Sequence, residues 1–196
     1  MKAIFYDTET TGLPLWNEPS EDPRQPHLVQ LAAALVDLDT RKTIASMNVI
    51  VRPQGWVIPE DVAKLHGITT EHAADVGVTE DIALGMFREL HGQRLRIAHN
   101  EPFDMRIIRI AMLRYTDEAT ADAWKAMPAE CTQALSTPIL KLPPTERMLA
   151  AGRYHYKSAN LAEAYRHFTG QELQNAHSAL ADVEACMAVY FAIKGA

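Results

Sequence analysis

The stretch IFYDTETTGL, residues 4–13, decides the fold and sets two acids close together at the end of a short apolar strand. Residues i and i+2 of a strand point to the same face of a sheet, so Asp7 and Glu9 share a face with Phe5, whereas Ile4 and Tyr6 point to the other. Neighbouring carboxylates repel each other, and burying such a pair is costly. Some other group must offset that cost.

Length and composition favour one domain spanning residues 1–196, because 196 residues, 47% of them apolar, suffice for a proper core. The sequence lacks a run of 18 or more apolar residues and does not open on a stretch of signal-peptide type, so we expect no membrane span, no membrane partner and no secretion. Cys131 and Cys186 lack the spacing of a metal or redox pair, and are expected to be reduced, buried thiols of a cytoplasmic protein.

The formal net charge of −6 is a poor match to a protein that grips duplex nucleic acid by bulk electrostatics. It leaves open a nucleic-acid enzyme whose bound metal ions carry the local positive charge. Acids dominate residues 59–91 and bases dominate residues 141–170. Both stretches are interpreted as solvated surface. Alternatively, the second stretch approaches the phosphates of a substrate.

Periodicity and turn residues predict one mixed α/β domain, with strands first and strands alternating with helices later. Predicted strands cover residues 2–8, 28–38, 43–52 and 94–100. Predicted helices cover residues 58–67, 79–91, 102–115, 160–170 and 178–193. The four prolines of PLWNEPSEDPRQPH, residues 14–27, indicate a loop, and STPILKLPPT, residues 136–145, is expected to be irregular within the poorly patterned stretch 116–158.

Two further acids lie where the helical pattern would bury them. Asp104 falls in the first turn of its predicted helix, on one face with Ile107 and Ile108, and Asp182 falls early in the last helix, among small alanines. Taken singly, such an acid is more often a solvated or helix-capping residue. Together, the four acids predict a hard-cation site for Mg²⁺ or Mn²⁺. Two such ions roughly 4 Å apart are a known arrangement for cleaving phosphodiesters.

His177 is the candidate general base. It lies five residues before Asp182, a spacing that would set the two side chains roughly 140° apart on a regular helix. The helix must therefore start after His177, with Ser178 as its N-cap, which leaves His177 on a loop at the mouth of the site. An unperturbed imidazole pKa of about 6.5 suits proton removal from water near neutrality.

Three motifs then carry a family resemblance: DTETTG at 7–12, HNEPFD at 99–104 and HSALAD at 177–182. In this order, over nearly the whole chain, they resemble the motifs of the DEDDh family, the DnaQ-like 3′→5′ exonucleases. The sister class has a tyrosine where this chain has Ser178. The resemblance implies an RNase H-like α/β fold, with a five-stranded mixed β-sheet flanked by α-helices. It also implies two divalent cations, Mg²⁺ or Mn²⁺, held by Asp7, Glu9, Asp104 and Asp182, with His177 as general base.

The resemblance also implies a pocket for the 3′-terminal nucleotide. The residues expected to line it are Thr10, Gly12, Leu13, Leu65, His66, Asn100 and Phe103. Alternatively, Leu65 and Phe103 are core residues and His66 only closes a helix. The chain departs from the family pattern in its longer loop at 14–27 and at Cys131-Thr132, where many members have an acid before the threonine.

The leading hypothesis is a metal-dependent 3′→5′ exonuclease that releases nucleoside 5′-monophosphates, most simply from single-stranded DNA. Alternatives are an RNA-trimming enzyme of the RNase T or oligoribonuclease kind, a proofreading subunit acting with a polymerase, and a catalytically idle binding module. The chain ends just after the last predicted helix, whereas replicative proofreading subunits carry a further segment for the polymerase, so a stand-alone or phage-type nuclease is favoured. An intact set of five catalytic residues disfavours the idle module.

Overall fold

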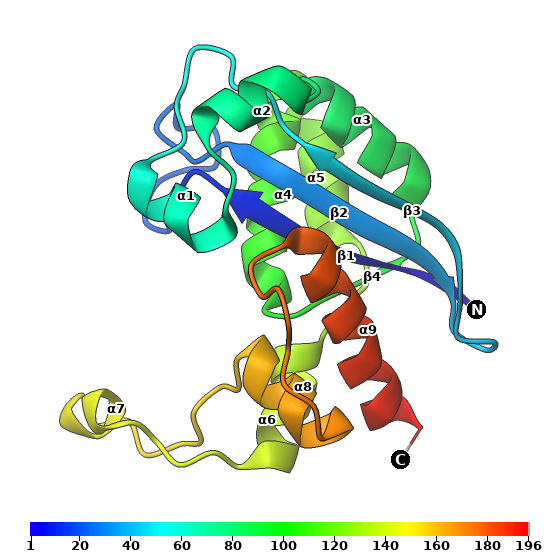
Figure 1. The fold of residues 1–196 in the computed structure, drawn as a ribbon, viewed down its shortest axis with the longest axis vertical. Helices are drawn as coiled ribbons and strands as arrows, with labels where there is room; N and C mark the ends of the chain where they lie inside the picture. Colours follow the sequence, from blue (N-terminus) through cyan, green and yellow to red (C-terminus); the bar gives the residue numbers. More distant parts are fainter. Residues whose placement is uncertain (196) are drawn as a thin grey trace.

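Five strands form one mixed sheet in the order β3-β2-β1-β4-β5 (Figure 1). The structure is a computed structural model and describes residues 1–195. The strands are β1 Lys2–Thr10, β2 Leu28–Asp37, β3 Lys42–Ile50, β4 Leu95–Ala98 and β5 Ala129–Cys131. The central strand β1 pairs antiparallel with β2 and parallel with β4. The predicted five-stranded mixed sheet flanked by helices is confirmed.

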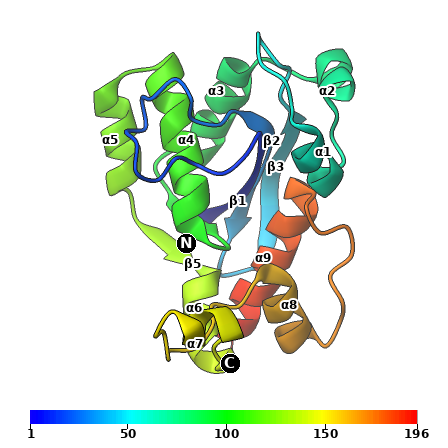
Figure 2. The same cartoon turned by 90° about the vertical axis from the view of Figure 1, so that its left-hand side faces the viewer.

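Helices cover both faces of this sheet (Figures 1 and 2). The helices are α1 Glu60–His66, α2 Thr70–Val76, α3 Glu80–His91, α4 Glu101–Tyr115, α5 Glu118–Ala126, α6 Thr132–Leu140, α7 Glu146–Ala150, α8 Leu161–Thr169 and α9 Ala179–Lys194. One apolar cluster joins the sheet to α3, α4 and α5, and a second joins it to α9. Among residues 1–195, no helix is long and apolar enough to cross a membrane.

The alternation along β1 divides its side chains between these two clusters, as the sequence predicts. Tyr6 packs edge-on against Trp124 of α5, on the face covered by α3, α4 and α5. Phe5 packs edge-on against Tyr190 of α9, on the other face. Because Asp7 and Glu9 continue the alternation of Phe5, they point toward the side of the sheet that α9 covers.

Most predicted elements are confirmed with small changes at their ends, and two regions are corrected. The stretch 136–145 is not wholly irregular, because α6 runs to Leu140 through Pro138. The helix tolerates Pro138 in its second half, where it costs one backbone hydrogen bond while Leu135 packs in the cluster below α9. Helix α2 was not predicted, since it has only seven residues and no apolar stripe; the Thr69 side chain caps it.

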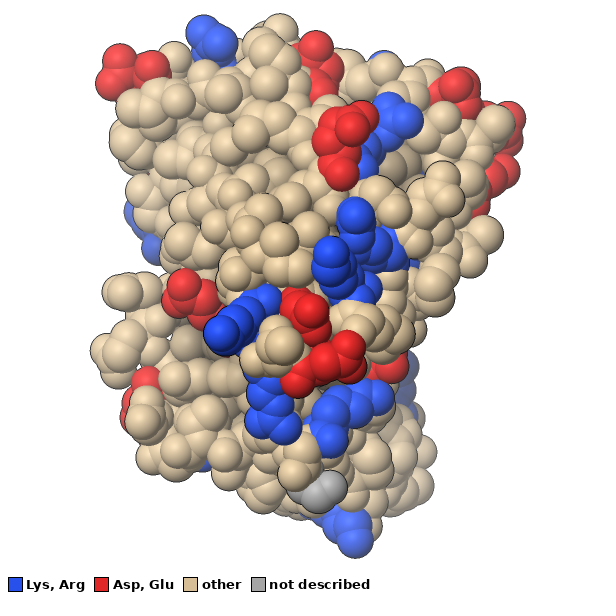
Figure 3. Space-filling view, turned by 90° about the vertical axis from the view of Figure 1, so that its right-hand side faces the viewer, with Lys and Arg blue, Asp and Glu red and all other residues tan. Residues whose placement is uncertain are grey.

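Acidic and basic side chains mix on the side of the molecule that carries β3 and the β2–β3 hairpin (Figure 3). On this face the two signs lie next to each other rather than forming one broad basic surface. The arrangement agrees with the net charge of −6 and with the argument against bulk electrostatic binding of duplex nucleic acid.

Candidate active site

The four predicted acids meet at the carboxyl end of β1. Asp7 and Glu9 lie near the end of that strand, Asp104 lies in the first turn of α4, and Asp182 lies in the first turn of α9. Strands β1 and β4 run parallel, so the start of α4, which follows β4, arrives beside the end of β1. All four acids and His177 line one cavity of about 440 Å³. The folding of three distant segments therefore produces the predicted cluster.

Burial and mutual repulsion make these carboxyl groups hard to ionise. Burial is the first cause that raises the pKa of Asp7 well above its usual range, followed by the charges of Asp104, Asp182 and Glu9. Burial and then Asp182 raise the pKa of Glu9 to about 7. Burial raises the pKa of Asp104 to about 8, although two hydrogen bonds from Thr8 oppose the shift. Without a cation, the ionised cluster is costly, as the sequence predicts.

The acids present oxygens suited to a hard cation. Oδ1 of Asp182 is buried and has no hydrogen-bond partner among the described residues. A buried oxygen of this kind requires a partner, such as a hydrogen-bond donor or a cation. One ligating atom each of Glu9, His177 and Asp182 lie within 4.8 Å of one another. Divalent cations of the Mg²⁺ type prefer carboxylate oxygens. The residues present therefore fit a divalent metal site.

His177 lies on the loop directly before α9, as predicted from its spacing to Asp182. Ser178 occupies the N-cap position, and the helix starts at Ala179. The Ser178 side chain makes no capping bond; instead, Oε1 of Gln30 accepts the N–H of Ala179 at 3.1 Å. The backbone N–H of His177 donates to Oδ2 of Asp182 at 3.1 Å. This bond holds the exposed imidazole beside the acid cluster.

Six of the seven predicted substrate residues line the same cavity: Thr10, Gly12, Leu13, Leu65, Asn100 and Phe103. Leu65 is 56% exposed, so the alternative that it is a core residue is wrong. Phe103 is half-buried, packs against the core and lines the cavity, so both of its interpretations hold in part. His66 does not line the cavity. It is buried at the end of α1, where its Nδ1 accepts the N–H of Ile68 at 3.1 Å.

Two residues inside the motifs were missed by the sequence reasoning. Thr8 lies between the two acids of β1 and donates two hydrogen bonds to Asp104, from its N–H at 3.0 Å and its hydroxyl at 2.7 Å. His99 precedes Asn100 and also lines the cavity. Thr8 could have been found in the sequence, because it places a hydroxyl at a strand position that is predicted to be buried and therefore needs a hydrogen-bond partner. Nothing local pointed to the partners of His99, which lie 33 and 60 residues away.

Comparison with known proteins decides the family, since a family model described as exonuclease, RNase T, matches residues 4–190. The chain belongs to this exonuclease family. The resemblance to the DnaQ-like 3′→5′ exonucleases is thereby confirmed. The exonuclease is 32% identical over 104 residues to DNA polymerase III subunit epsilon of Pasteurella multocida, a match covering 53% of this chain and 39% of that protein. The corresponding subunit of Haemophilus influenzae is 31% identical over 104 residues, covering 53% and 38%.

Solved structures share the fold of the exonuclease. Escherichia coli exonuclease I in complex with a dT13 oligonucleotide superposes with a TM-score of 0.72 at 20% identity, covering 96% of this chain and 40% of that one. Exonuclease I of Methylocaldum szegediense superposes with a TM-score of 0.73 at 22% identity, covering 99% and 40%. The RNase H-like fold is thus confirmed. The chain spans about two fifths of the length of these relatives.

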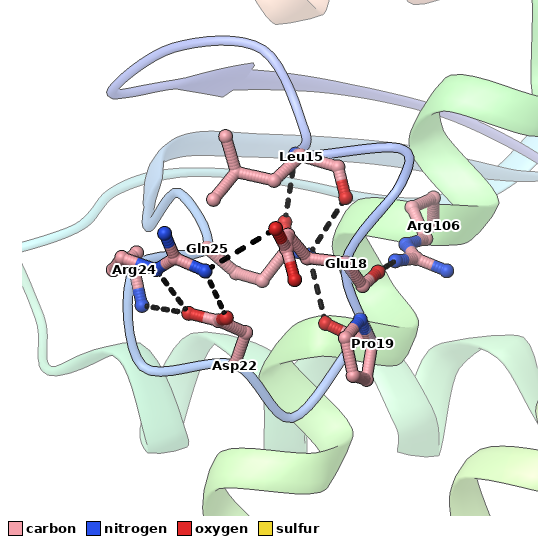
Figure 4. Close-up of polar contacts among 7 residues, drawn as sticks. All are labelled: Leu15, Glu18, Pro19, Asp22, Arg24, Gln25 and Arg106. Carbon is pink, nitrogen blue, oxygen red and sulfur yellow. Dashed lines mark hydrogen bonds and ion pairs between the residues drawn. The ribbon is translucent and has the colours of Figure 1, made fainter.

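The long loop at 14–27 is held in place by hydrogen bonds within the loop and to helix α4 (Figures 2 and 4). Gln25 is buried at its centre, accepts the N–H of Leu15 at 3.0 Å, and donates to the carbonyls of Leu15 at 3.1 Å and Pro19 at 2.9 Å. Arg106 of α4, two residues after Asp104, donates to the carbonyl of Glu18 at 2.6 Å. The loop is therefore fastened to the helix that carries one of the acids.

Proposed function

We propose that this exonuclease removes nucleotides one at a time from the 3′ end of single-stranded DNA and releases nucleoside 5′-monophosphates. The observation that carries the proposal is the convergence of Asp7, Glu9, Asp104, Asp182 and His177 on one cavity. Four carboxylates with raised pKa values and a buried, unpartnered oxygen are the environment that a pair of Mg²⁺ or Mn²⁺ ions relieves.

The four acids would hold the ions, and His177 would move the proton. When bound, the divalent cations supply positive charge that stabilises the attacked phosphate and favours ionisation of the attacking water. The neutral imidazole of His177 accepts the proton of that water through a ring nitrogen on the acid side of the cavity. Oxygen of water bonds to phosphorus, the bond from phosphorus to the 3′ oxygen of the preceding nucleotide breaks, and that oxygen takes up a proton.

The shape of the cavity favours an unpaired 3′ end. Leu13 and Leu65 line it and are 77% and 56% exposed, so they offer apolar contacts to a base or sugar that enters. A terminal nucleotide must be separated from a complementary strand to enter such a cavity. The net charge of −6 argues in the same direction, because it gives no general attraction for duplex nucleic acid.

A second candidate is a proofreading role with a polymerase. Three relatives matched by sequence are polymerase III epsilon subunits, and that likeness is the observation in its favour. Both candidates share the same chemistry at the 3′ end and differ in the partner. Copurification of the exonuclease with a polymerase subunit, at an activity increased by that subunit, would favour the second.

The test uses one sequence as 5′-labelled single-stranded DNA, duplex DNA and RNA, each with Mg²⁺ and with excess chelator. We expect stepwise shortening of the single-stranded DNA, no cleavage with chelator and resistance of a strand with a blocked 3′ end. Asp7→Asn should be folded and inactive. Faster cleavage of RNA would overturn the choice of DNA, and cuts within a circular single strand would overturn the exonucleolytic direction.

A further inference from the structure

The start of α9 receives its cap from another part of the chain. Ser178 stands at the N-cap position, but its side chain makes no capping hydrogen bond. Instead, Oε1 of Gln30 on β2 accepts the N–H of Ala179 at 3.1 Å. Ala179 is fully buried, so this N–H depends on a partner within the protein. A side chain 149 positions away in the sequence therefore does the work of the N-cap.

The sheet places Gln30 beside the acid cluster but outside the catalytic cavity. Gln30 is the antiparallel partner of Glu9, and residues directly opposite each other point to the same face of a sheet. Its side chain therefore lies on the face that α9 covers, and the residue is only 7% exposed. Gln30 does not line the catalytic cavity. Any effect of Gln30 on the reaction must then pass through another residue.

Asn48 fixes which end of the Gln30 amide faces α9. Nε2 of Gln30 donates to Oδ1 of Asn48 at 2.8 Å. Because an amide has one donor end and one acceptor end, this bond turns Oε1 of Gln30 toward Ala179. Asn48 is exposed and lies on β3, the edge strand of the sheet. A chain of two hydrogen bonds thus joins the edge of the sheet to the start of α9.

The backbone before α9 needs this support. His177 has a φ angle of 67°, in the left-handed region that residues other than glycine seldom adopt. Its side chain is exposed, so packing does little to hold it. Two hydrogen bonds flank it, one to Asp182 and one from Ala179 to Gln30. Asp182, by contrast, lies on a helix that Val183 anchors in an apolar cluster. Loss of the Gln30 bond should therefore release His177 more than Asp182.

We propose that Gln30 is a positioning residue that holds His177 at the acid cluster. It acts through the start of α9, and Asn48 orients its amide. One ligating atom each of Glu9, His177 and Asp182 lie within 4.8 Å of one another, a spacing that requires α9 to begin at a fixed place over the sheet. This inference rests on the proposed function, in which His177 accepts the proton of water.

The test replaces the amide without changing the volume of the side chain much. At saturating Mn²⁺, Gln30→Met should lower kcat on single-stranded DNA about 10–100-fold, the usual cost of losing a partner of a site residue. KM for the strand and the Mn²⁺ affinity measured by calorimetry should stay nearly unchanged. Asn48→Ala, which changes only an exposed residue, should cause a smaller loss of the same kind. Ser46→Ala, exposed on the same face of β3, is the matched control and should behave like wild type.

A double-mutant cycle separates positioning from general stabilisation. In the His177→Ala background, Gln30→Met should cause little further loss of kcat, because the residue that it positions is gone. A purely structural role would give the same loss in both backgrounds. That result, or a normal kcat in Gln30→Met, would overturn the proposal.

Amide hydrogen exchange in the metal-free protein tests the same bond without any activity. In Gln30→Met, the N–H of Ala179 should exchange about tenfold faster, in line with the loss of one hydrogen bond, and the amides of β1 should exchange as in wild type. A wild type that cleaves no single strand would overturn the proposed function. An exchange rate of Ala179 that equals the wild-type rate would overturn the role of Gln30, whether or not the wild type cleaves DNA.

Discussion

Oδ1 of Asp104 accepts two hydrogen bonds from Thr8, one from the backbone N–H at 3.0 Å and one from the hydroxyl at 2.7 Å. The pair joins α4 to β1 at the level of the other acids, so it fixes one acid against the strand that carries two more. We expect Thr8→Val to weaken metal binding about 10–100-fold, the usual cost of losing a partner of a metal ligand. Activity titrated against Mg²⁺ would show this as a higher half-saturating concentration.

Thr8→Ser is the matched control, because it keeps the hydroxyl and removes one methyl group. It should titrate with Mg²⁺ like wild type. A Thr8→Val enzyme that needs no more Mg²⁺ than wild type would show that the hydrogen bond from the Thr8 hydroxyl does not position Asp104 for the metal.

The raised pKa values also predict how stability of the metal-free protein depends on pH. Folding raises the pKa of Glu9 to about 7 and that of Asp104 to about 8, so the folded state binds more protons than the unfolded chain between about pH 4 and these values. These groups therefore favour folding at low pH, and their contribution is lost as pH rises through 7 and 8. The melting temperature without metal should fall from pH 5 to pH 8.

Excess Mg²⁺ should flatten this dependence, because the ions bind the ionised carboxylates of the folded state. Asp104→Asn should flatten it in part without metal, since one of the groups no longer titrates. The charge of Asp104 also raises the pKa of Asp7, so the difference between the two melting curves reports Asp104 together with its effect on Asp7. A difference that stays constant from pH 5 to pH 8 would contradict the raised pKa.

The ordered loop at 14–27 predicts a role for Trp16, which is 55% exposed on it but does not line the catalytic cavity. If Trp16 stacks on a base, Trp16→Ala should weaken binding of single-stranded DNA about tenfold with little change in kcat. Gln25→Ala should do the same and should also lower stability by about 1–3 kcal/mol, because the buried Gln25 side chain makes hydrogen bonds to the backbone of Leu15 and Pro19 that the variant loses. Fluorescence anisotropy and thermal unfolding provide the two measurements.

Arg24→Ala is the control for this loop. Arg24 is exposed and pairs with Asp22 on the surface, so its loss should change neither binding nor stability appreciably. Equal affinity of wild type, Trp16→Ala and Gln25→Ala for the strand would indicate that the loop makes no contact with substrate.

Parts of the candidate metal site could be predicted from sequence because their physical causes are local. Alternation along β1 sets Asp7 and Glu9 on one face, and the spacing from His177 to Asp182 requires the helix to begin between them. The region 116–158 could not be predicted in the same way. Its β5 has three residues and α7 has five, so neither shows a period. The position of β5 depends on its pairing with β4, for example of Glu130 with Ile97, which are distant in the sequence.

The last prediction concerns His177, whose ring nitrogen lies within 4.8 Å of carboxylate oxygens of Glu9 and Asp182. That geometry suits a base beside the acids and equally a metal ligand, and the two roles have different consequences. As a base, His177→Ala should lower kcat roughly 10²–10⁴-fold, the usual contribution of such catalysis, and leave the affinity for Mn²⁺ nearly unchanged. As a ligand, it should weaken Mn²⁺ binding. Calorimetry with Mn²⁺ and single-turnover rates at saturating metal separate the roles. Normal turnover at saturating Mn²⁺, combined with weakened binding, would remove the general base from the mechanism and add His177 to the metal ligands.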